Sequence, residues 1–559
     1  MKKLTIILIL LSVTGITFAQ RKSKKKEKPK QEAEGNVTIT PDTTQPRTVT
    51  VTAAFKPSLK TSSKINFSAA SPTPDTALPK LNYNVPAQNL FFSYQSVPLK
   101  PLAENIDTAI HWQNKNYVKA GYGNFTTPYL QTGLSFGDGV NSVVNVHAKY
   151  TSSKGPLTYQ DFSKLNIEAL GIFSDSANAN EWSGKLFYNT STQYQYGYQP
   201  DTLKFTKDDL KQQFTTFGGK VGVRNKKEND AGISYSPSIG LTLFNDNRDG
   251  KESNFIIDAP LSKSFGKIYA FNLGLTADVT SYKSDSGTVN NNLYYITPSV
   301  QFNTPNFKLI AGIKPAWDNG VFSMLPNVTA EAKIKDEKLI LLAGWVGYFN
   351  KNTYQSLAGI NPWLAQPHSF LNTRITEQYA GFKGSAGDHF TYNAKVSYLQ
   401  FSNQPFFVND TVTGKSFTVV NESQMKDIRL HGEVGYTVQE KFSVLAGASF
   451  NQYSNLQDNQ KAWGMLPLEI NGSLRWEVLK DVLIKSDVFF WDGPQYRSKQ
   501  LTAQKLDPAF DVNAGIEFKI VKQLNFWAQF NNLLNNHYER WHQYQALGFN
   551  VLLGVVYSF

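Results

Sequence analysis

Histidine is the residue type in this chain best suited to acid–base or metal chemistry, because the sequence contains no cysteine. The histidines show no metal-ligand spacing and no accompanying nucleophile motif, and they are His111, His147, His368, His389, His431, His537 and His542. His537 and His542 are close enough to share a metal ion, but an aromatic loop with two incidental histidines is the favoured interpretation. We therefore expect no enzyme, no metal and no cofactor.

Positive charge is concentrated near the N-terminus of a chain whose formal net charge is +12. The stretch Arg21–Lys30 contains seven basic residues and one acid. Such a run either contacts anionic lipid or peptidoglycan or forms a solvated, self-repelling tail, and we assign it no binding role. It has no aromatic partners, and the glycines lie at strand spacing rather than in a phosphate loop, so nucleic acid is not an expected partner.

The first residues predict export from the cytoplasm. Lys2 and Lys3 precede the apolar run Leu4–Leu11, and the small residue Ala19 precedes Gln20, which together indicate a signal peptide over residues 1–19. Without a cysteine at the cleavage site we expect no lipid anchor. No later segment supplies the roughly 18 apolar residues that a spanning helix requires, so a membrane location requires strands.

Period-two alternation of apolar and polar residues runs through most of the chain from about Lys115 onward. Ile428, Leu430 and Val434 alternate with Arg429 and Glu433, which indicates strands with one apolar and one polar face. The alternating runs are about ten residues or longer, the length needed to cross a bilayer when tilted. The polar face would line the interior of a closed barrel, and the candidate residues facing that lumen are Arg429, Glu433, Arg475, Glu477 and Asp487.

We count about 22 such segments, an even number, as bacterial single-chain membrane barrels require. If the last strand ends in the periplasm, the predicted periplasmic connections are short, and most of the predicted outer ones, such as 351–373, 403–421 and 492–507, are long. The fold class predicted is therefore all-β, a transmembrane antiparallel barrel over 111–559. It is preceded by a basic and Pro/Thr-rich segment, 20–110, that lies in the periplasm or the lumen. The outer membrane is the expected location, and its lipid the expected environment.

The last strand carries apolar residues at every second position and ends on an aromatic residue. Tyr557 and Phe559 at its end are similar to the signal by which the barrel-assembly machinery recognises its clients. An ordinary terminal strand would not need to end on Phe. The assembly machinery is therefore an expected partner.

The stretch Asn531–Trp541, followed by Leu547–Phe549 and Tyr557–Phe559, resembles the last hairpin of TonB-dependent receptor barrels. The export signal and the Asn/Tyr-rich strands are similar to proteins of the Bacteroidetes group. The resemblance covers about 115–559 and implies a 22-stranded barrel that transports a solute.

Members of that family also carry a plug domain of more than a hundred residues and a short box that pairs with TonB by strand addition. Only about ninety mature residues precede the first strand here, and we recognise no plug motif in them. A hexapeptide resembles the TonB box, and its residues are Thr48, Val49, Thr50, Val51, Thr52 and Ala53. Its alternative is a β-prone stretch of a linker, so TonB or another periplasmic protein is a candidate partner only.

Two functional classes remain open on the sequence. In the first, the barrel transports a solute across the outer membrane, with residues 31–107 filling part of the lumen or with the lumen open. In the second, it is a non-conducting structural or assembly component that anchors partner proteins. Family resemblance favours transport, although a fold does not determine a function. The solute and the oligomeric state are not specified by any motif.

Overall fold

The computed structural model describes residues 116–559, apart from 140, 175–179, 201, 228 and 440. The predicted signal peptide 1–19 and the whole of the segment 20–110, with the hexapeptide Thr48–Ala53, lie outside the described residues. The predicted boundary at residue 111 also falls outside them, and the first described strand begins at Tyr117. Within the described residues no helix is both long enough and apolar enough to span a membrane.

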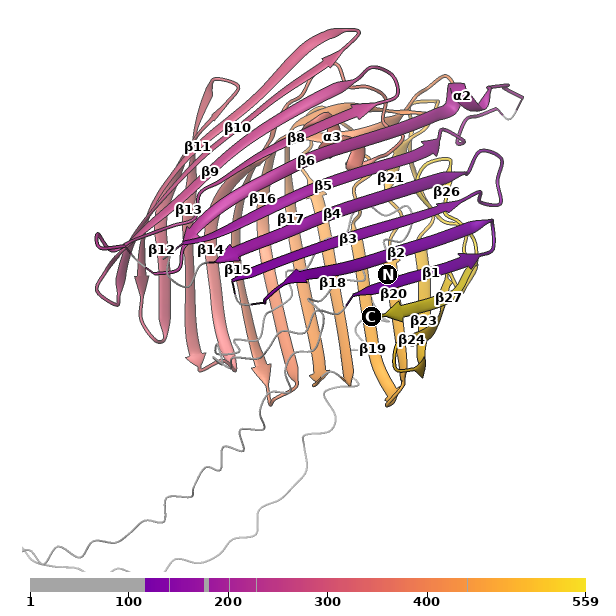
Figure 1. Cartoon of the computed structure of the whole chain (residues 1–559). Helices are drawn as coiled ribbons and strands as arrows, with labels where there is room; N and C mark the ends of the chain where they lie inside the picture. The colour runs from indigo at the N-terminus through magenta and orange to yellow at the C-terminus, as the bar shows by residue number, and fades with distance from the viewer. Residues whose placement is uncertain (1–115, 140, 175–179, 201, 228, 440) are drawn as a thin grey trace, which may run out of the picture. The chain divides into compact units, whose positions relative to one another are not determined.

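One closed antiparallel sheet forms the barrel, with 22 crossing strands in chain order (Figure 1). They are β1 (Tyr117–Gly123), β2 (Thr127–Gly137), β3 (Ser142–Ser153), β4 (Phe162–Ser174), β5 (Asn180–Tyr194), β6 (Lys211–Asn225), β7 and β8 (Ile233–Tyr235 and Ser238–Asp246), β9 (Lys251–Phe265), β10 (Tyr269–Ser284), β11 (Gly287–Asn303), β12 (Phe307–Asp318), β13 (Val321–Lys335), β14 (Leu339–Asn350), β15 (Thr373–Ala386), β16 (Phe390–Asn409), β17 (Phe417–Val438), β18 (Phe442–Ser454), β19 (Leu468–Leu479), β20 (Val482–Trp491), β23 (Ala509–Val521), β24 (Leu524–Asn531) and β27 (Asn550–Ser558). This confirms the predicted fold class.

The sheet closes between its first and last strands, because Lys119 of β1 lies opposite both Gln131 of β2 and Val556 of β27. Closure removes the unpaired edges that a sheet cannot expose to lipid. β7 and β8 are two parts of one crossing strand, since both pair with β9. Pro237 lies between them and cannot donate a ladder hydrogen bond, which accounts for the interruption.

The two faces of the wall differ in exposure as the alternation predicts. Ile428, Leu430 and Val434 of β17 are 45 to 46% exposed and form part of an apolar outer face, whereas Asp427, immediately before Ile428, is fully buried. An apolar outer face is suited to contact with lipid hydrocarbon. The hydrogen bonds between neighbouring strands satisfy the backbone N–H and C=O groups of every strand.

The connections at one end of the barrel are short, and those at the other end, the mouth, include all the long ones. Small elements lie in these long connections, and they are α2 (Lys207–Leu210), α3 (Tyr354–Ile360), β21 (Gln495–Arg497), β22 (Ala503–Lys505), β25 (Glu539–Trp541) and β26 (Tyr544–Gln545). The predicted loop over 403–421 is much shorter in the structure. β16 and β17 continue as a paired hairpin to Asn409 and Phe417, which leaves only 410–416 as a turn.

Candidate functional site

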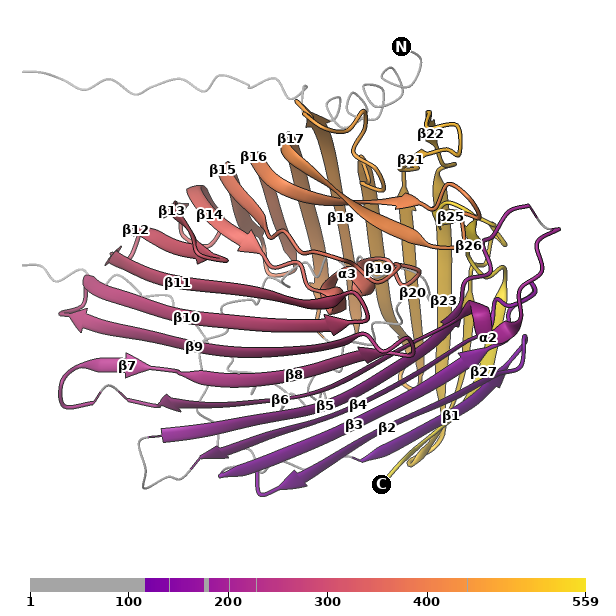
Figure 2. The ribbon, with the colours of Figure 1, turned by 90° about the horizontal axis from the view of Figure 1, so that it is seen from above.

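The connection 351–372 folds into the mouth of the barrel instead of extending away from it. Figure 2, the view from above, shows its helix α3 within the ring of strands. Thr353 begins α3 with a capping box, in which its hydroxyl accepts from the Ser356 N–H at 3.1 Å and its own N–H donates to the Ser356 hydroxyl at 2.8 Å. The buried residues Tyr354 and Leu357 then face the wall.

Carboxylates of β8 and β9 hold the start of α3. The Tyr354 N–H donates to Glu252 at 2.6 Å, and the Tyr354 hydroxyl donates to Asp246 at 2.8 Å. Burial, together with the nearby Asp246 carboxylate, raises the pKa of Tyr354 well above its usual value. The phenol therefore remains a hydrogen-bond donor at any physiological pH, and this attachment is stable to deprotonation.

The two ends of the connection 351–372 are fixed by further polar contacts with the inner wall. Lys351 forms an ion pair with Asp278 of β10. Asn291 of β11 donates to the Asn352 carbonyl at 2.9 Å, and Asn372 accepts from the Asn352 N–H at 2.9 Å. The three asparagines are buried, so each partner lost by one of them would leave an unsatisfied polar atom at a cost of about 1 to 3 kcal/mol.

The middle of the connection reaches the wall on β5 and β6. Gln193 donates to the Pro362 carbonyl at 2.7 Å, and Gln212 donates to the Leu364 carbonyl at 2.9 Å. The Trp363 indole N–H donates to the Tyr194 carbonyl at 3.2 Å. The connection therefore crosses the mouth from β14 and β15 to β5 and β6.

Two other segments complete a cover that we name the mouth lid, consisting of 351–372, the β16–β17 tip 404–422 and the connection 532–549. Trp363 stacks on Tyr544 with ring centroids 3.9 Å apart, and Leu364 forms a parallel bridge with Phe417. Phe417 also packs on Trp541 at 5.5 Å. The lid interior is buried and aromatic, with Trp363 3% exposed, Leu364 0% and Phe417 1%.

The two neighbouring histidines of the sequence analysis lie in the last lid segment and do not converge. His542 stacks on Tyr496 at 3.8 Å, and its Nδ1 lies 3.4 Å from Glu539. His537 instead lies beside Gly548. Across the part of the chain that the structure describes, no group of three or more His, Asp or Glu side chains has the arrangement of a metal site.

The five predicted lumen residues lie on β17, β19 and β20, on the polar face of each strand. Arg429 donates to Asn451 at 2.7 Å and pairs with Asp427 at 3.2 Å. Glu433 lies 3.3 Å from His431.

Arg475 lies opposite Lys485, Glu477 opposite Leu483, and Asp487 opposite Ser473 and Asn513. Within the described residues no ion pair joins two of the five, so they are separate wall positions rather than one cluster. Their role along a solute path remains a prediction.

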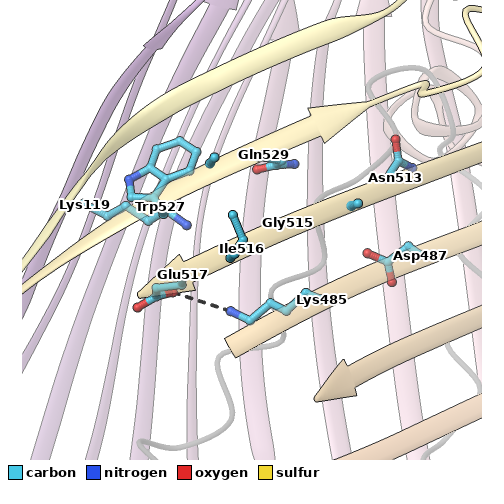
Figure 3. Close-up of a pocket in the computed structure, with 11 residues that line it drawn as sticks. Lys119, Lys485, Asp487, Asn513, Gly515, Ile516, Glu517, Trp527 and Gln529 are labelled. Carbon is cyan, nitrogen blue, oxygen red and sulfur yellow. Dashed lines mark ion pairs between the residues drawn. The ribbon is translucent and has the colours of Figure 1, made fainter. Parts of the chain in front are cut away.

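Sequence reasoning missed a pocket on this same polar face, near the seam where the barrel closes (Figure 3). Lys119, Trp527 and Asp487 are among its lining residues, and Lys485 approaches Glu517 to 3.9 Å. Trp527 lies flat on two glycines, because a Cβ at Gly121 would come within 2.4 Å of the indole and one at Gly554 within 2.8 Å. The small residues of β1 and β27 are the sequence signal that could have indicated this arrangement.

Tyr557 and Phe559, the predicted assembly signal, lie at the short-connection end of the barrel. Both are about half exposed, at 47 and 54%, and their rings stack with centroids 5.8 Å apart. Recognition by the assembly machinery stays a prediction.

No family model and no curated protein matches this chain by sequence. Solved structures match its fold. The FrpB iron transporter from Neisseria meningitidis (F3-3 variant) has a TM-score of 0.62 at 10% identity, with 80% of this chain and 82% of that chain covered. The siderophore receptor PiuA from Acinetobacter baumannii has a TM-score of 0.60 at 10% identity, with 80% and 82% covered.

The ferripyoverdine receptor of the outer membrane of Pseudomonas aeruginosa has a TM-score of 0.59 at 10% identity, with 81% and 72% covered. These proteins are transporters and receptors rather than enzymes. At this identity the likeness is one of fold. The described chain therefore has the 22-stranded barrel fold of TonB-dependent siderophore receptors.

Proposed function

We propose that this protein is an outer-membrane transport barrel whose outer mouth is gated by the mouth lid. The observation that carries the proposal is that the connection 351–372 crosses the mouth from β14 and β15 to β5 and β6, above a wall with charged side chains on its polar face. An apolar outer face and the receptor-like fold support the same function. The solute is not specified at this level.

The lid is built in a way that allows it to move without unfolding the wall. The barrel ladder closes through β1 and β27 and does not depend on the lid. The lid segments meet one another through the Trp363–Tyr544 stack and the Leu364–Phe417 bridge. Opening would expose a polar path at the cost of these contacts and of the hydrogen bonds that 351–372 makes with the wall.

A reversible lock tests this function. Because the chain has no cysteine, the double variant Leu364→Cys with Phe417→Cys allows one intramolecular disulfide, between residues already paired across a bridge. We expect the oxidised variant to show lower ion conductance in planar bilayers than the same protein after reduction. The reduced form is its own matched control, since the two samples share every substitution.

The second candidate function is a non-conducting anchor for partner proteins, and the buried, aromatic interior of the lid favours it. An anchor would show no conductance in either redox state, and loosening the lid would not change that. A conductance that responds to the lock would therefore support transport against the anchor.

Two partner proposals accompany the transport function. The barrel-assembly machinery would recognise the terminal strand through Tyr557 and Phe559. The hexapeptide Thr48–Ala53 is the segment that would pair with TonB if uptake is coupled to energy. Deleting 48–53 should then abolish energised uptake while leaving lid-dependent conductance unchanged, whereas uptake that survives the deletion would count against TonB coupling.

A further inference from the structure

Three lysines gather on the polar face of the first strands of the barrel. Lys119 of β1 lies opposite Gln131 of β2, which in turn lies opposite Lys149 of β3. In the adjacent row, Thr151 of β3 lies opposite Lys164 of β4. The register therefore places three ammonium-bearing side chains on four neighbouring strands within two rows of the ladder.

Aromatic rings hold these ammonium groups in place. The Lys119 Nζ lies 4.1 Å from the centre of the Trp527 ring and 5.8 Å from that of Tyr129. The Lys149 Nζ lies 5.6 Å from the same Tyr129 ring, and the Lys164 Nζ lies 5.9 Å from Phe162. A ring quadrupole attracts a cation without cancelling its formal charge, so the positive potential of the group persists.

Two carboxylates near this group also interact with other side chains. Glu168, one row away, pairs with Lys185 at 2.8 Å. Glu517 accepts from Asn525 at 2.8 Å and approaches Lys485 at 3.9 Å. The three lysines thus lie in a region of the wall where basic side chains outnumber acidic ones.

A buried hydroxyl lies in the middle of the group. Thr151 is 9% exposed, and within the described residues its Oγ1 has no hydrogen-bond partner. It shares its face with Lys149 and lies opposite both Tyr129 and Lys164. A buried hydroxyl without a partner costs free energy, which a ligand oxygen would recover.

Hydrogen bonds fix the polar neighbours of this hydroxyl. The Tyr129 hydroxyl donates to Gln131 at 2.6 Å, and the Gln131 amide donates to the Tyr117 hydroxyl at 2.9 Å. The Gln131 amide also lies 3.1 Å from His147 Nε2. The wall around Thr151 is therefore ordered before any ligand arrives, which lowers the entropy cost of binding.

We propose that Lys119, Lys149, Lys164 and Thr151 form a binding site, the basic wall patch, for a solute with two or more carboxylate or phosphate groups. The proposal rests on the transport function and specifies the class of solute. The Lys119 and Lys149 ammonium groups approach the Tyr129 ring from two strands separated by β2, so two positive charges lie near one another, which favours a solute with more than one anionic group. A low-dielectric wall strengthens that attraction.

Binding to the purified full-length protein tests the proposal. Citrate is the carboxylate probe and pyrophosphate the phosphate probe, each titrated by calorimetry against sodium chloride of equal ionic strength. We expect at least one probe to bind saturably, and Lys149→Gln and Lys164→Gln each to weaken it by about tenfold, because a hydrogen bond to a charged group is lost. Thr151→Val, which removes only the hydroxyl, should also weaken binding.

Lys220→Gln is the matched control, since Lys220 lies on the same face of the wall two strands beyond β4, outside the patch. It should leave the affinity within about twofold. Far-ultraviolet circular dichroism verifies that each variant is folded, and Thr151→Val keeps the test decisive if a lysine variant fails to fold.

The proposal would be overturned if neither probe bound saturably. It would also be overturned if Lys220→Gln weakened binding as much as the lysine variants of the patch do. The lid-lock conductance measures transport independently. If the reduced protein conducts ions but binds neither probe, the proposed transport function stands and the proposed binding site is wrong.

Discussion

The indole of Trp363 stacks on the phenol of Tyr544 with centroids 3.9 Å apart and an interplanar angle of 26°. The two residues belong to connections that leave the wall at different places, after β14 and after β24. Tyr544 also donates to the Lys415 carbonyl in the turn after β16. A single aromatic pair therefore joins all three segments of the mouth lid.

Trp363→Ala should open the lid. Removing a buried Trp side chain costs about 3 to 5 kcal/mol, and here the loss falls on the lid rather than on the wall ladder. We expect higher single-channel conductance with an unchanged urea midpoint for the barrel. Trp345→Ala is the matched control, because Trp345 of β14 is 50% exposed on the outer wall and contributes nothing to the lid. Conductance equal to that of the wild type would exclude Trp363 as a gate contact.

The strands of the wall could be predicted from the sequence because the alternation of apolar and polar residues is visible within each short segment. Ile428 and Arg429 belong to opposite faces simply because they are neighbours in a strand. The lid could not be predicted in this way. The hydrogen bond from Gln193 to the Pro362 carbonyl joins residues 169 positions apart, and the segment 351–372 has no periodic pattern that indicates where it packs.

The β16–β17 tip shows a second limit. The expectation of a long outer connection favoured a loop there, yet Phe406 and Phe407 are 0% and 6% exposed. The strands continue because one face of the tip, with Phe407, packs within the lid, while the other face, with Phe406, packs in a buried cluster that includes Trp463. This tertiary packing overrides the local preference. The basic wall patch was missed for a related reason, since its lysines are distant in sequence and meet only through strand register.

The turn between β16 and β17 should loosen at low pH. Partial burial works against ionised Asp410, but hydrogen bonds from the Thr413 hydroxyl and from nearby backbone N–H groups outweigh it, so the pKa of Asp410 is lowered. A carboxyl with a lowered folded-state pKa stabilises the turn above its unfolded value of about 3.9, and this contribution is lost as pH falls through the folded value. The turn should therefore be well ordered at pH 7, where Asp410 is ionised.

A spin label on Val412→Cys reports that change, because Val412 is 76% exposed and the chain has no other cysteine. The label should be restricted at pH 7 and more mobile at pH 2. Adding Asp410→Asn should make it mobile at both pH values. If the labelled protein gave the same spectrum at pH 7 with and without the Asp410→Asn substitution, the carboxylate would not be what holds the turn.

The lipid face can be tested at two adjacent residues of β19. Ile470 is 44% exposed on the apolar face, and Asn471 belongs to the opposite face. Ile470→Arg should destabilise the barrel by about 2 to 4 kcal/mol near the bilayer midplane, and Asn471→Arg should cost far less. Urea unfolding in lipid vesicles measures both. Equal costs would mean that the faces are assigned wrongly.

The orientation of the barrel predicts which end is reached from outside the cell. A protease site inserted after Leu501, which is 58% exposed at the mouth end, should be cleaved on intact cells. The same insertion after Asp336, in a short turn at the opposite end, should be protected. The connection 351–372 is a poor place for such a site, because its packing in the mouth would hide it. Cleavage at residue 336 alone would reverse the orientation.

The last prediction concerns the segment 31–107, which we propose fills part of the lumen. A 22-stranded barrel is wide enough to enclose a plug, so the lid and this segment would act as two barriers in series. Deleting 31–107 while keeping the signal peptide should then raise conductance modestly, because the lid still closes the mouth. Combining the deletion with Trp363→Ala should raise conductance by more than the sum of the two single effects, and should sensitise cells to large antibiotics.

Series barriers explain why the double variant is the decisive measurement. If the segment lies outside the lumen, the double variant will conduct no better than Trp363→Ala alone. If neither single variant nor the double variant conducts, the lumen is sealed by something other than the lid and the segment. That last result would favour the anchor over the transporter, because no path would remain for a solute even with both barriers removed.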